Sequence, residues 1–251
     1  MSAIIVEDFH KTYDSTVAVA GLSFEMAPGT ILGLVGPNGA GKTTTMRALA
    51  GILAPTRGRL IVDGHDLATE SIQAKAALAY IPDDPRLFDQ LTIWEHLRFV
   101  ASAYRMQDWQ PYAEELIKTF ELTDKRDSTC SDLSRGMRQK VAICCAYLHH
   151  PKVMMFDEPL TGLDPYAIRA IKESIRKRAA EGAAIMISSH LLSLIEDLCT
   201  AILILNKGEK VLHATMEELR RQAEIDGRHE SLEDLFFRLT KQPEATTSEG
   251  A

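Results

Sequence analysis

Residues 36–44 constrain the fold of this chain more than any other segment. They read Gly-Pro-Asn-Gly-Ala-Gly-Lys-Thr-Thr, which fits the spacing G-x-x-x-x-G-K-[ST] of a phosphate-binding loop. The apolar run Ile31–Val35 before the loop predicts a buried strand, and apolar residues at helical spacing over 43–53 predict a helix. A loop between a strand and a helix is the context in which this motif is informative, whereas a chance match in a glycine-rich turn lacks these flanks.

The residue types of this loop suit the binding of a nucleotide's phosphates. Glycines let the backbone fold closely around an anion and present its N–H groups. The N-terminus of the following helix adds partial positive charge. Lys42 supplies a full charge for the β- and γ-phosphates, and the Thr43 hydroxyl can ligate Mg²⁺. The residues expected to contact the nucleotide are Gly36, Pro37, Asn38, Gly39, Ala40, Gly41, Lys42, Thr43 and Thr44.

Composition limits the partners. The 251 residues carry 28 Lys and Arg against 35 Asp and Glu, a formal net charge of −7, which does not favour binding to a nucleic-acid backbone. The four cysteines show no C-x-x-C spacing and the start has no signal-peptide pattern, so we expect a reduced, cytosolic setting. No apolar run approaches the roughly 20 residues of a membrane span, so any membrane role is expected to come through a partner.

Hydrophobic periodicity changes along the chain from strands to helices and back. Short β-rich runs occur at Ile4–Val6, Leu22–Met26 and Arg59–Val62, and the pattern is helical from Thr92 to His150. Strand and helix patterns alternate again from Lys152, with a helix predicted over Pro165–Ala180. The sequence therefore predicts an α/β domain with a largely parallel core sheet, interrupted by a helical insertion.

These patterns divide the chain into three parts. Their expected ranges are 1–82 with 151–215 for the core, 83–150 for the helical insertion and 216–251 for a helical tail. The chain end, Pro243–Ala251, lacks apolar anchors and is expected to be disordered.

Two carboxylates follow a second apolar run, Val153–Phe156. A buried parallel strand would place Asp157 at the edge of the sheet beside the phosphate loop, where it suits a role with Mg²⁺. Glu158 can then act as the general base for the attacking water. The alternative is a strand that ends in a solvated acidic turn, which the phosphate loop in the same chain disfavours.

His190 follows a further predicted strand, Ala184–Ile187. A histidine at that place can donate a hydrogen bond to a γ-phosphate, and the alternative is a surface histidine beside a helix N-cap. Ser134 is a good N-cap, but Arg135, Arg138 and Lys140 put cations where they oppose the helix dipole. A nearby anion would relieve this, and a solvent-exposed basic helix is an equally good local interpretation.

Together these segments resemble the nucleotide-binding subunit of an ATP-binding cassette (ABC) transporter over roughly residues 4–215. Gly36–Thr43 resembles the Walker A motif, Leu133–Gln139 the LSGGQ-type signature and Val153–Glu158 the Walker B motif. Leu163-Asp164 is similar to the D-loop, and His190 to the switch histidine. Tyr13 stands where the family's aromatic residue stacks on adenine, although it could also be a core or surface tyrosine.

The resemblance implies a fold and a mechanism. The fold would be a P-loop NTPase core, with a RecA-like parallel sheet, an N-terminal antiparallel β-subdomain and an inserted helical subdomain. The cofactors would be ATP and Mg²⁺, held between two copies arranged head to tail or between this chain and a related second ATPase subunit. One copy would supply the Walker motifs, with Asp157 and Thr43 at the metal and Glu158 and His190 as catalytic residues. The other copy would supply Ser134, Arg135, Gly136 and Met137 of the signature.

By the same resemblance, the chain would drive a separate transmembrane permease and lie on the inner face of the cell membrane through it. Soluble ABC ATPases of DNA repair or ribosomes usually carry a long coiled coil or two tandem cassettes, which this sequence lacks. A regulatory cassette that moves no substrate stays open as an alternative.

Two departures from the family pattern point to a subfamily. Asp83 stands at the Q-loop glutamine, and whether it takes that residue's metal-sensing role stays open, so it is only a candidate metal ligand. Arg135 and Met137 replace a glycine and a glutamine of the signature. Such sequences resemble ABC-2-type exporters, as does the predicted terminal helix over Ser231–Thr240.

Overall fold

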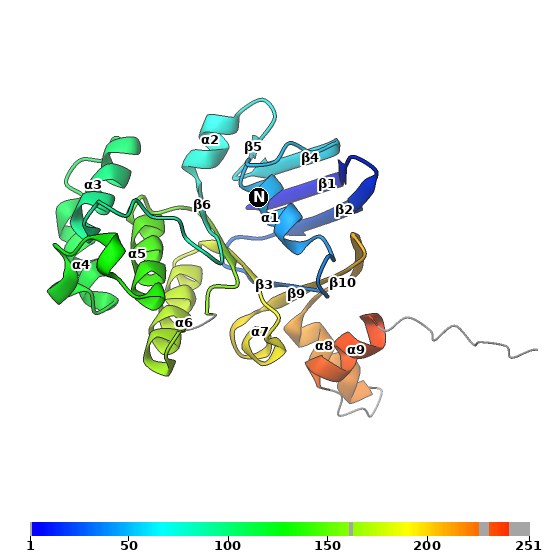
Figure 1. Ribbon diagram of the computed structural model, residues 1–251. Coiled ribbons are helices and arrows are strands. Elements are labelled where there is room, and N and C mark those ends of the chain that lie inside the picture. Colours follow the sequence, from blue (N-terminus) through cyan, green and yellow to red (C-terminus); the bar gives the residue numbers. More distant parts are fainter. Residues whose placement is uncertain (1, 161–162, 226–230, 241–251) are drawn as a thin grey trace, which may run out of the picture.

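The computed structural model describes residues 2–160, 163–225 and 231–240, and its largest sheet has six strands (Figure 1). The strand order is β10-β9-β3-β8-β7-β6. Neighbouring strands pair in parallel except for β9 and β10, which form an antiparallel hairpin. The bounds are β3 Ile31–Val35, β6 Leu78–Ile81, β7 Val153–Asp157, β8 Ala184–Ser188, β9 Ala201–Asn206 and β10 Glu209–Thr215.

A second, antiparallel sheet has the strand order β2-β1-β4-β5. Its strands are β1 Ile4–Tyr13, β2 Thr16–Met26, β4 Arg57–Val62 and β5 His65–Asp66. The strands β1 and β2 are longer than the predicted runs Ile4–Val6 and Leu22–Met26. Their pairing contains register shifts between Val6 and Thr12, and such irregularities interrupt the alternation from which strands are recognised.

The helices cover both sheets. Their bounds are α1 Lys42–Leu49, α2 Ser71–Ala76, α3 Ile93–Ala103, α4 Gln110–Thr119, α5 Arg135–Leu148, α6 Pro165–Ala180, α7 Leu192–Leu198, α8 Met216–Ile225 and α9 Leu232–Thr240. The helix α6 matches its prediction, whereas α1 ends before the predicted Leu53 because Gly51 adopts a left-handed conformation with φ +65°. Among the helices in the described ranges, none is long and apolar enough to cross a membrane.

The six-stranded sheet separates two hydrophobic cores. In β3, Ile31 and Val35 face the core formed with α3 to α7, whereas Leu32 and Leu34 face the core shared with α1 and the antiparallel sheet. Figure 1 shows α1 between the two sheets. This packing fixes the loop between β3 and α1 from both sides.

The helices α3, α4 and α5 lie at one side of the molecule, where α5 packs on β6 (Figure 1). The rings of Trp94 and Trp109 are 4.9 Å apart, and the Arg126 guanidinium lies 3.9 Å from the centre of the Trp94 ring. At the other side, α9 packs on α7, and Ser231 caps its start, since the Ser231 hydroxyl accepts a hydrogen bond from the Asp234 N–H. The predicted disorder of the last residues falls on 241–251, outside the described residues.

Candidate nucleotide site

The phosphate-type loop has no room for larger side chains at two of its glycines. A Cβ at Gly36 would lie 2.4 Å from the carbonyl oxygen of Leu205, so the backbone at the end of β9 excludes any side chain at position 36. Gly41 has φ +98° and is the N-cap of α1, without a side chain to satisfy the first N–H groups. The first turn of α1 holds no acidic residue, so its positive end is available to an anion.

Lys42 lies over this loop. Its Nζ donates to the carbonyl oxygens of Gly36 at 2.6 Å and Pro37 at 3.2 Å. Burial lowers the pKa of Lys42, while the charges of Glu158 and Asp157 act in the opposite direction. A cation is therefore held where the loop would enclose phosphate groups.

Asp157 ends β7 and is oriented by its two neighbouring strands. Ser188, paired with it in register at the end of β8, donates its hydroxyl to one carboxylate oxygen. Tyr80 of β6 donates to the other oxygen at 3.2 Å, and burial, followed by the Asp157 charge, raises the pKa of Tyr80 so that it stays a donor. The Asp157 side chain is thus fixed at the sheet edge.

Glu158 has the left-handed backbone angle φ +50°, which is uncommon for a residue with a side chain. Its N–H donates to the carbonyl oxygen of Ser188 at 3.1 Å, and its carboxylate lies 2.9 Å from Nδ1 of His190. Burial raises the pKa of Glu158, with His190 and then Lys42 opposing this shift. A carboxylate with a raised pKa is a better proton acceptor near neutral pH, and backbone strain of this kind gathers at functional sites.

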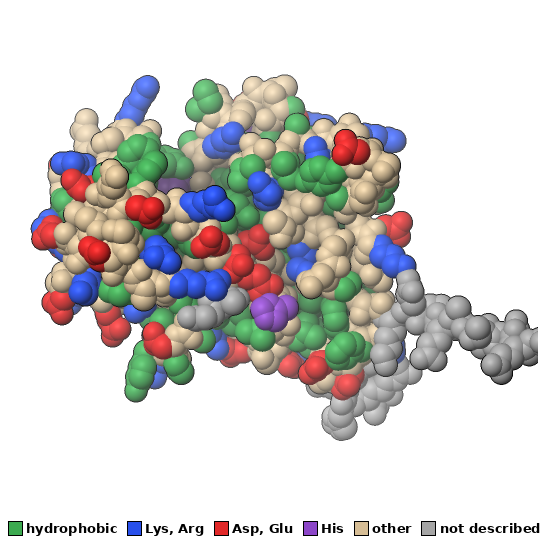
Figure 2. Space-filling model, in the orientation of Figure 1, with side chains coloured by type: hydrophobic (Ala, Val, Ile, Leu, Met, Phe, Trp, Pro, Cys, Tyr) green, Lys and Arg blue, Asp and Glu red, His purple; other side chains and the backbone are tan. Residues whose placement is uncertain are grey.

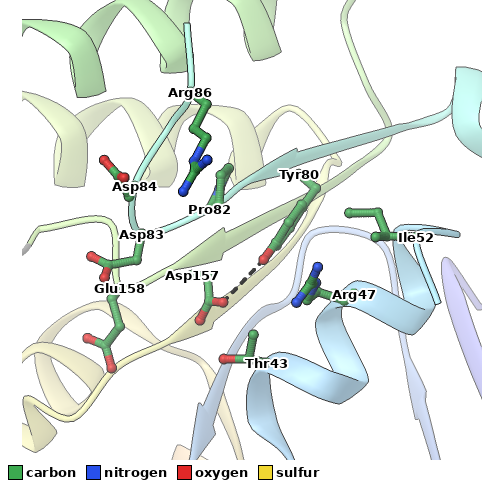
Figure 3. A pocket seen from close by; sticks show the side chains of 10 residues that line it. All are labelled: Thr43, Arg47, Ile52, Tyr80, Pro82, Asp83, Asp84, Arg86, Asp157 and Glu158. Carbon is green, nitrogen blue, oxygen red and sulfur yellow. Dashed lines mark hydrogen bonds between the residues drawn. The ribbon is translucent and has the colours of Figure 1, made fainter.

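Asp157 and Glu158 line a pocket of about 660 Å³ (Figure 3). Figure 3 shows Thr43, Asp157 and Glu158 along one part of it, and Figure 2 shows acidic side chains in a hollow on this face with basic ones at its edges. The lining residues are Thr43, Arg47, Ile52, Tyr80, Pro82, Asp83, Asp84, Arg86, Asp157 and Glu158. A hydroxyl and a fixed carboxylate are hard oxygen donors of the kind Mg²⁺ takes beside nucleotide phosphates, so these residues fit that ion.

The signature residues lie elsewhere. The Ser134 hydroxyl accepts from the Met137 N–H at 3.3 Å, which confirms Ser134 as the N-cap of α5. A Cβ at Gly136 would lie 3.2 Å from Cδ2 of Leu163, so the D-loop segment rests on the signature. Neither Ser134 nor Gly136 is among the described residues that line the pocket.

Three further candidate residues can be placed. Tyr13 at the end of β1 is 42% exposed, which removes the core interpretation, and the Lys11 ammonium lies 5.1 Å from the centre of its ring. Asp164 is the N-cap of α6, and the backbone hydrogen bond from Ala167 lowers the pKa of Asp164. Asp83 lines the pocket and pairs with Arg135 at 3.2 Å.

The two residues that donate hydrogen bonds to Asp157 were not assigned from the sequence. They are Tyr80 and Ser188. Ser188 directly follows a predicted strand, so pairing of that strand with the Asp157 strand could have indicated it. Tyr80 carried no such signal, because nothing in the sequence places β6 beside β7.

Comparisons with known proteins agree on one family. A sequence model of the family described as ABC transporter matches residues 19–161. The ATP-binding protein EcsA of Bacillus subtilis (strain 168) is 35% identical over 244 residues, covering 96% of this chain and 98% of the relative. Nod factor export ATP-binding protein I of Paraburkholderia xenovorans (strain LB400) is 35% identical over 212 residues, covering 84% of this chain and 70% of the relative.

Solved structures confirm the predicted fold class. A structure described as the ATP binding subunit of an ABC transporter has a TM-score of 0.90 and 35% identity, covering 96% of this chain and all 100% of that chain. A bacterial Atm1-family ABC exporter with ATP bound has a TM-score of 0.78 and 28% identity, covering 90% of this chain and 41% of the exporter chain. The chain therefore belongs to the ABC transporter family as an ATP-binding subunit, an ATPase whose hydrolysis of ATP powers transport.

Proposed function

We propose that two chains, this one and a second copy or a related ATPase subunit, hydrolyse Mg²⁺–ATP at a site they share head to tail, and that their closing drives export through a separate transmembrane subunit. One observation carries the shared site. Thr43, Asp157 and Glu158 line the pocket, whereas the Ser134 hydroxyl caps its own helix at the Met137 N–H and Gly136 packs against Leu163. A second chain is the simplest source of a signature facing this pocket.

The residues in and around the pocket have roles that follow from their contacts. Lys42 and the N-terminus of α1 bind the phosphates, and Glu158 accepts the proton of the attacking water. His190 holds the Glu158 carboxylate through their 2.9 Å contact. Mg²⁺, when bound by Thr43 and Asp157, would neutralise phosphate charge. Asp83 stays a candidate ligand whose carboxylate is engaged by Arg135.

The remaining assignments rest on the family. Tyr13 would stack on adenine, and Asp164 would belong to the segment joining the two chains' sites. The core over 1–82 and 151–215 would bind ATP, the insertion over 83–150 would pass its closing to the membrane subunit, and 216–251 would be an accessory tail. The permease would hold the chain at the inner face of the cell membrane. Export is favoured by the names of two similar proteins, a Nod factor export ATP-binding protein and an Atm1-family exporter.

The substitution Glu158→Gln tests this proposal. The amide cannot accept the proton, so we expect hydrolysis to fall by about 10²- to 10⁴-fold while ATP binding persists and an ATP-dependent dimer accumulates. Phosphate release measures the first effect, and size-exclusion chromatography with light scattering measures the second. Glu173→Gln, in an exposed ion pair on α6, is the control that should behave like the wild type. Hydrolysis by Glu158→Gln at the wild-type rate would remove the general-base assignment, and a monomer at saturating ATP would remove the shared site.

A further inference from the structure

An ion pair connects the signature helix to the nucleotide pocket of its own chain. Nη2 of Arg135, the first residue of α5, lies 3.2 Å from Oδ1 of Asp83, in the loop after β6. The two residues are 52 positions apart, and their side chains are 50% and 52% exposed. Asp83 lines the pocket and Arg135 does not, so the pair joins the rim of the pocket to the signature.

Acidic side chains outnumber basic ones around the pocket, which disfavours the binding of a negatively charged triphosphate. Four carboxylates line the pocket, Asp83, Asp84, Asp157 and Glu158, against two arginines, Arg47 and Arg86, and the Lys42 ammonium of the phosphate loop acts on Asp157 and Glu158. Ser188 and Tyr80 hold Asp157, and His190 holds Glu158. An uncompensated carboxylate on this rim would repel a triphosphate.

The start of α5 has an excess of positive charge. A cation in the first turn of a helix is repelled by the partial positive charge of the N-terminus. The neighbouring basic residues have their own partners, since Arg138 donates to the Leu133 carbonyl oxygen at 2.9 Å and Nζ of Lys140 lies 3.8 Å from Glu121. Asp83 supplies the anion that Arg135 requires, from within the same chain.

We infer that Arg135 is a positioning residue for its own chain's nucleotide pocket: it neutralises Asp83 and thereby raises the affinity for ATP before any second chain binds. This role is separate from the proposed contact of Arg135 with the partner's nucleotide. It rests on the ATP pocket of the proposed function and not on the shared site.

A double-mutant cycle on nucleotide binding tests this inference. The variants are Arg135→Ala, Asp83→Asn and the two combined, each titrated with a fluorescent ATP analogue and Mg²⁺ at protein concentrations where light scattering shows a monomer. We expect Arg135→Ala to weaken binding about two- to fivefold at about 0.02 M salt, the range of an exposed ion pair. The combined variant should bind like the wild type, because the Asp83→Asn change leaves no charge at this position to neutralise.

Further measurements separate the pair from a general loss of structure. Arg135→Lys should keep most of the affinity, and the effect of Arg135→Ala should shrink at about 0.5 M salt. Arg169→Ala breaks the exposed pair with Glu173 on α6 and should leave ATP binding unchanged. If Arg135→Ala lost as much affinity in the Asp83→Asn background as in the wild type, or lost none at low salt, the inference would be overturned. Because only monomers are titrated, a failed dimer test for Glu158→Gln leaves this result standing, and the reverse holds as well.

Discussion

At the scale of single residues, the orientation of Asp157 depends on hydroxyl groups from both neighbouring strands. β8 supplies Ser188 and β6 supplies Tyr80, so the carboxylate is bound on two sides. Ser188 also receives the Glu158 N–H, at 3.1 Å on its carbonyl oxygen and 3.2 Å on its hydroxyl. One serine therefore connects both acidic residues of the site.

Replacing Ser188 by alanine should lower activity more than nucleotide binding. The change removes a buried hydrogen bond to a charged group, worth about 1.5–3 kcal/mol, so we expect kcat to fall roughly tenfold or more with a smaller change in KM. Steady-state hydrolysis at saturating Mg²⁺ measures this. Ser174→Ala is the matched control, because it removes a half-buried hydroxyl that bonds Tyr147 away from the pocket. An equal loss of kcat in both variants would show that Ser188 acts only through stability.

At the scale of helices and strands, the elements predicted correctly from the sequence are those whose local sequence pattern is uninterrupted. β3, β7 and β8 are continuous apolar runs, and α6 has an N-cap followed by proline, so their positions were confirmed to within a residue. The strands β1 and β2 were predicted too short because register shifts break their alternation. Local patterns fail where the partner strand sets the conformation.

The candidate site shows the same limit. Residues attached to a motif were assigned from the sequence, including Lys42, Glu158 and His190, but the 2.9 Å contact between Glu158 and His190 was not predicted. The pairs Tyr80–Asp157 and Asp83–Arg135 were not predicted from the sequence, because their members are 77 and 52 positions apart. Such contacts depend on which strands and helices become neighbours, which spacing along the chain does not encode.

The C-terminal end of α5 joins the helical segment to β6 through His149. Its Nε2 lies 3.2 Å from the carbonyl oxygen of Leu78, and its ring stacks on Tyr104 at 3.9 Å. Burial lowers the pKa of His149 to about 4, with a weaker opposing effect of the hydrogen bond to Leu78. The folded chain therefore holds this histidine neutral.

This predicts a pH dependence of stability. The unfolded chain takes up a proton at His149 below its usual pKa of about 6.5, whereas the folded chain does so only near pH 4. As the pH is lowered from about 6.5 to about 4, the free energy of unfolding should therefore decrease, by about 1–2 kcal/mol after allowance for partial exposure. His149→Gln, which keeps a donor for Leu78, should flatten this part of the profile in urea unfolding. Tyr104→Phe keeps the stacked ring and should retain the wild-type slope; identical slopes for all three proteins would contradict the assignment.

At the scale of the whole molecule, the six-stranded sheet carries the two halves of the machinery at separate places. The phosphate loop and both acidic residues lie at the ends of β3 and β7, whereas the signature begins α5 on the helical side. The described pocket receives Asp83 from the loop after β6, which is held by Arg135 of the signature helix. The ion pair between Asp83 and Arg135 thus connects the pocket to the signature surface that the proposed second chain would cover.

The division into two halves predicts a selective effect of bulk at Ser134. Ser134→Phe should block ATP-driven dimerisation of the Glu158→Gln chain while the monomer's affinity for ATP changes less than about twofold, since Ser134 is outside the residues lining its own pocket. Ser134→Ala is the comparison variant. Both changes remove the cap hydrogen bond from the Met137 N–H, at a cost of about 1 kcal/mol, and the hydroxyl proposed to face the partner's nucleotide, but only phenylalanine adds volume, so we expect Ser134→Ala to weaken dimerisation less than Ser134→Phe does. Light scattering across an ATP titration, beside monomer binding of the same analogue, separates the two effects. If Ser134→Phe weakened monomer binding as strongly as dimerisation, the Ser134 side chain would face its own chain's nucleotide and the head-to-tail arrangement would be wrong.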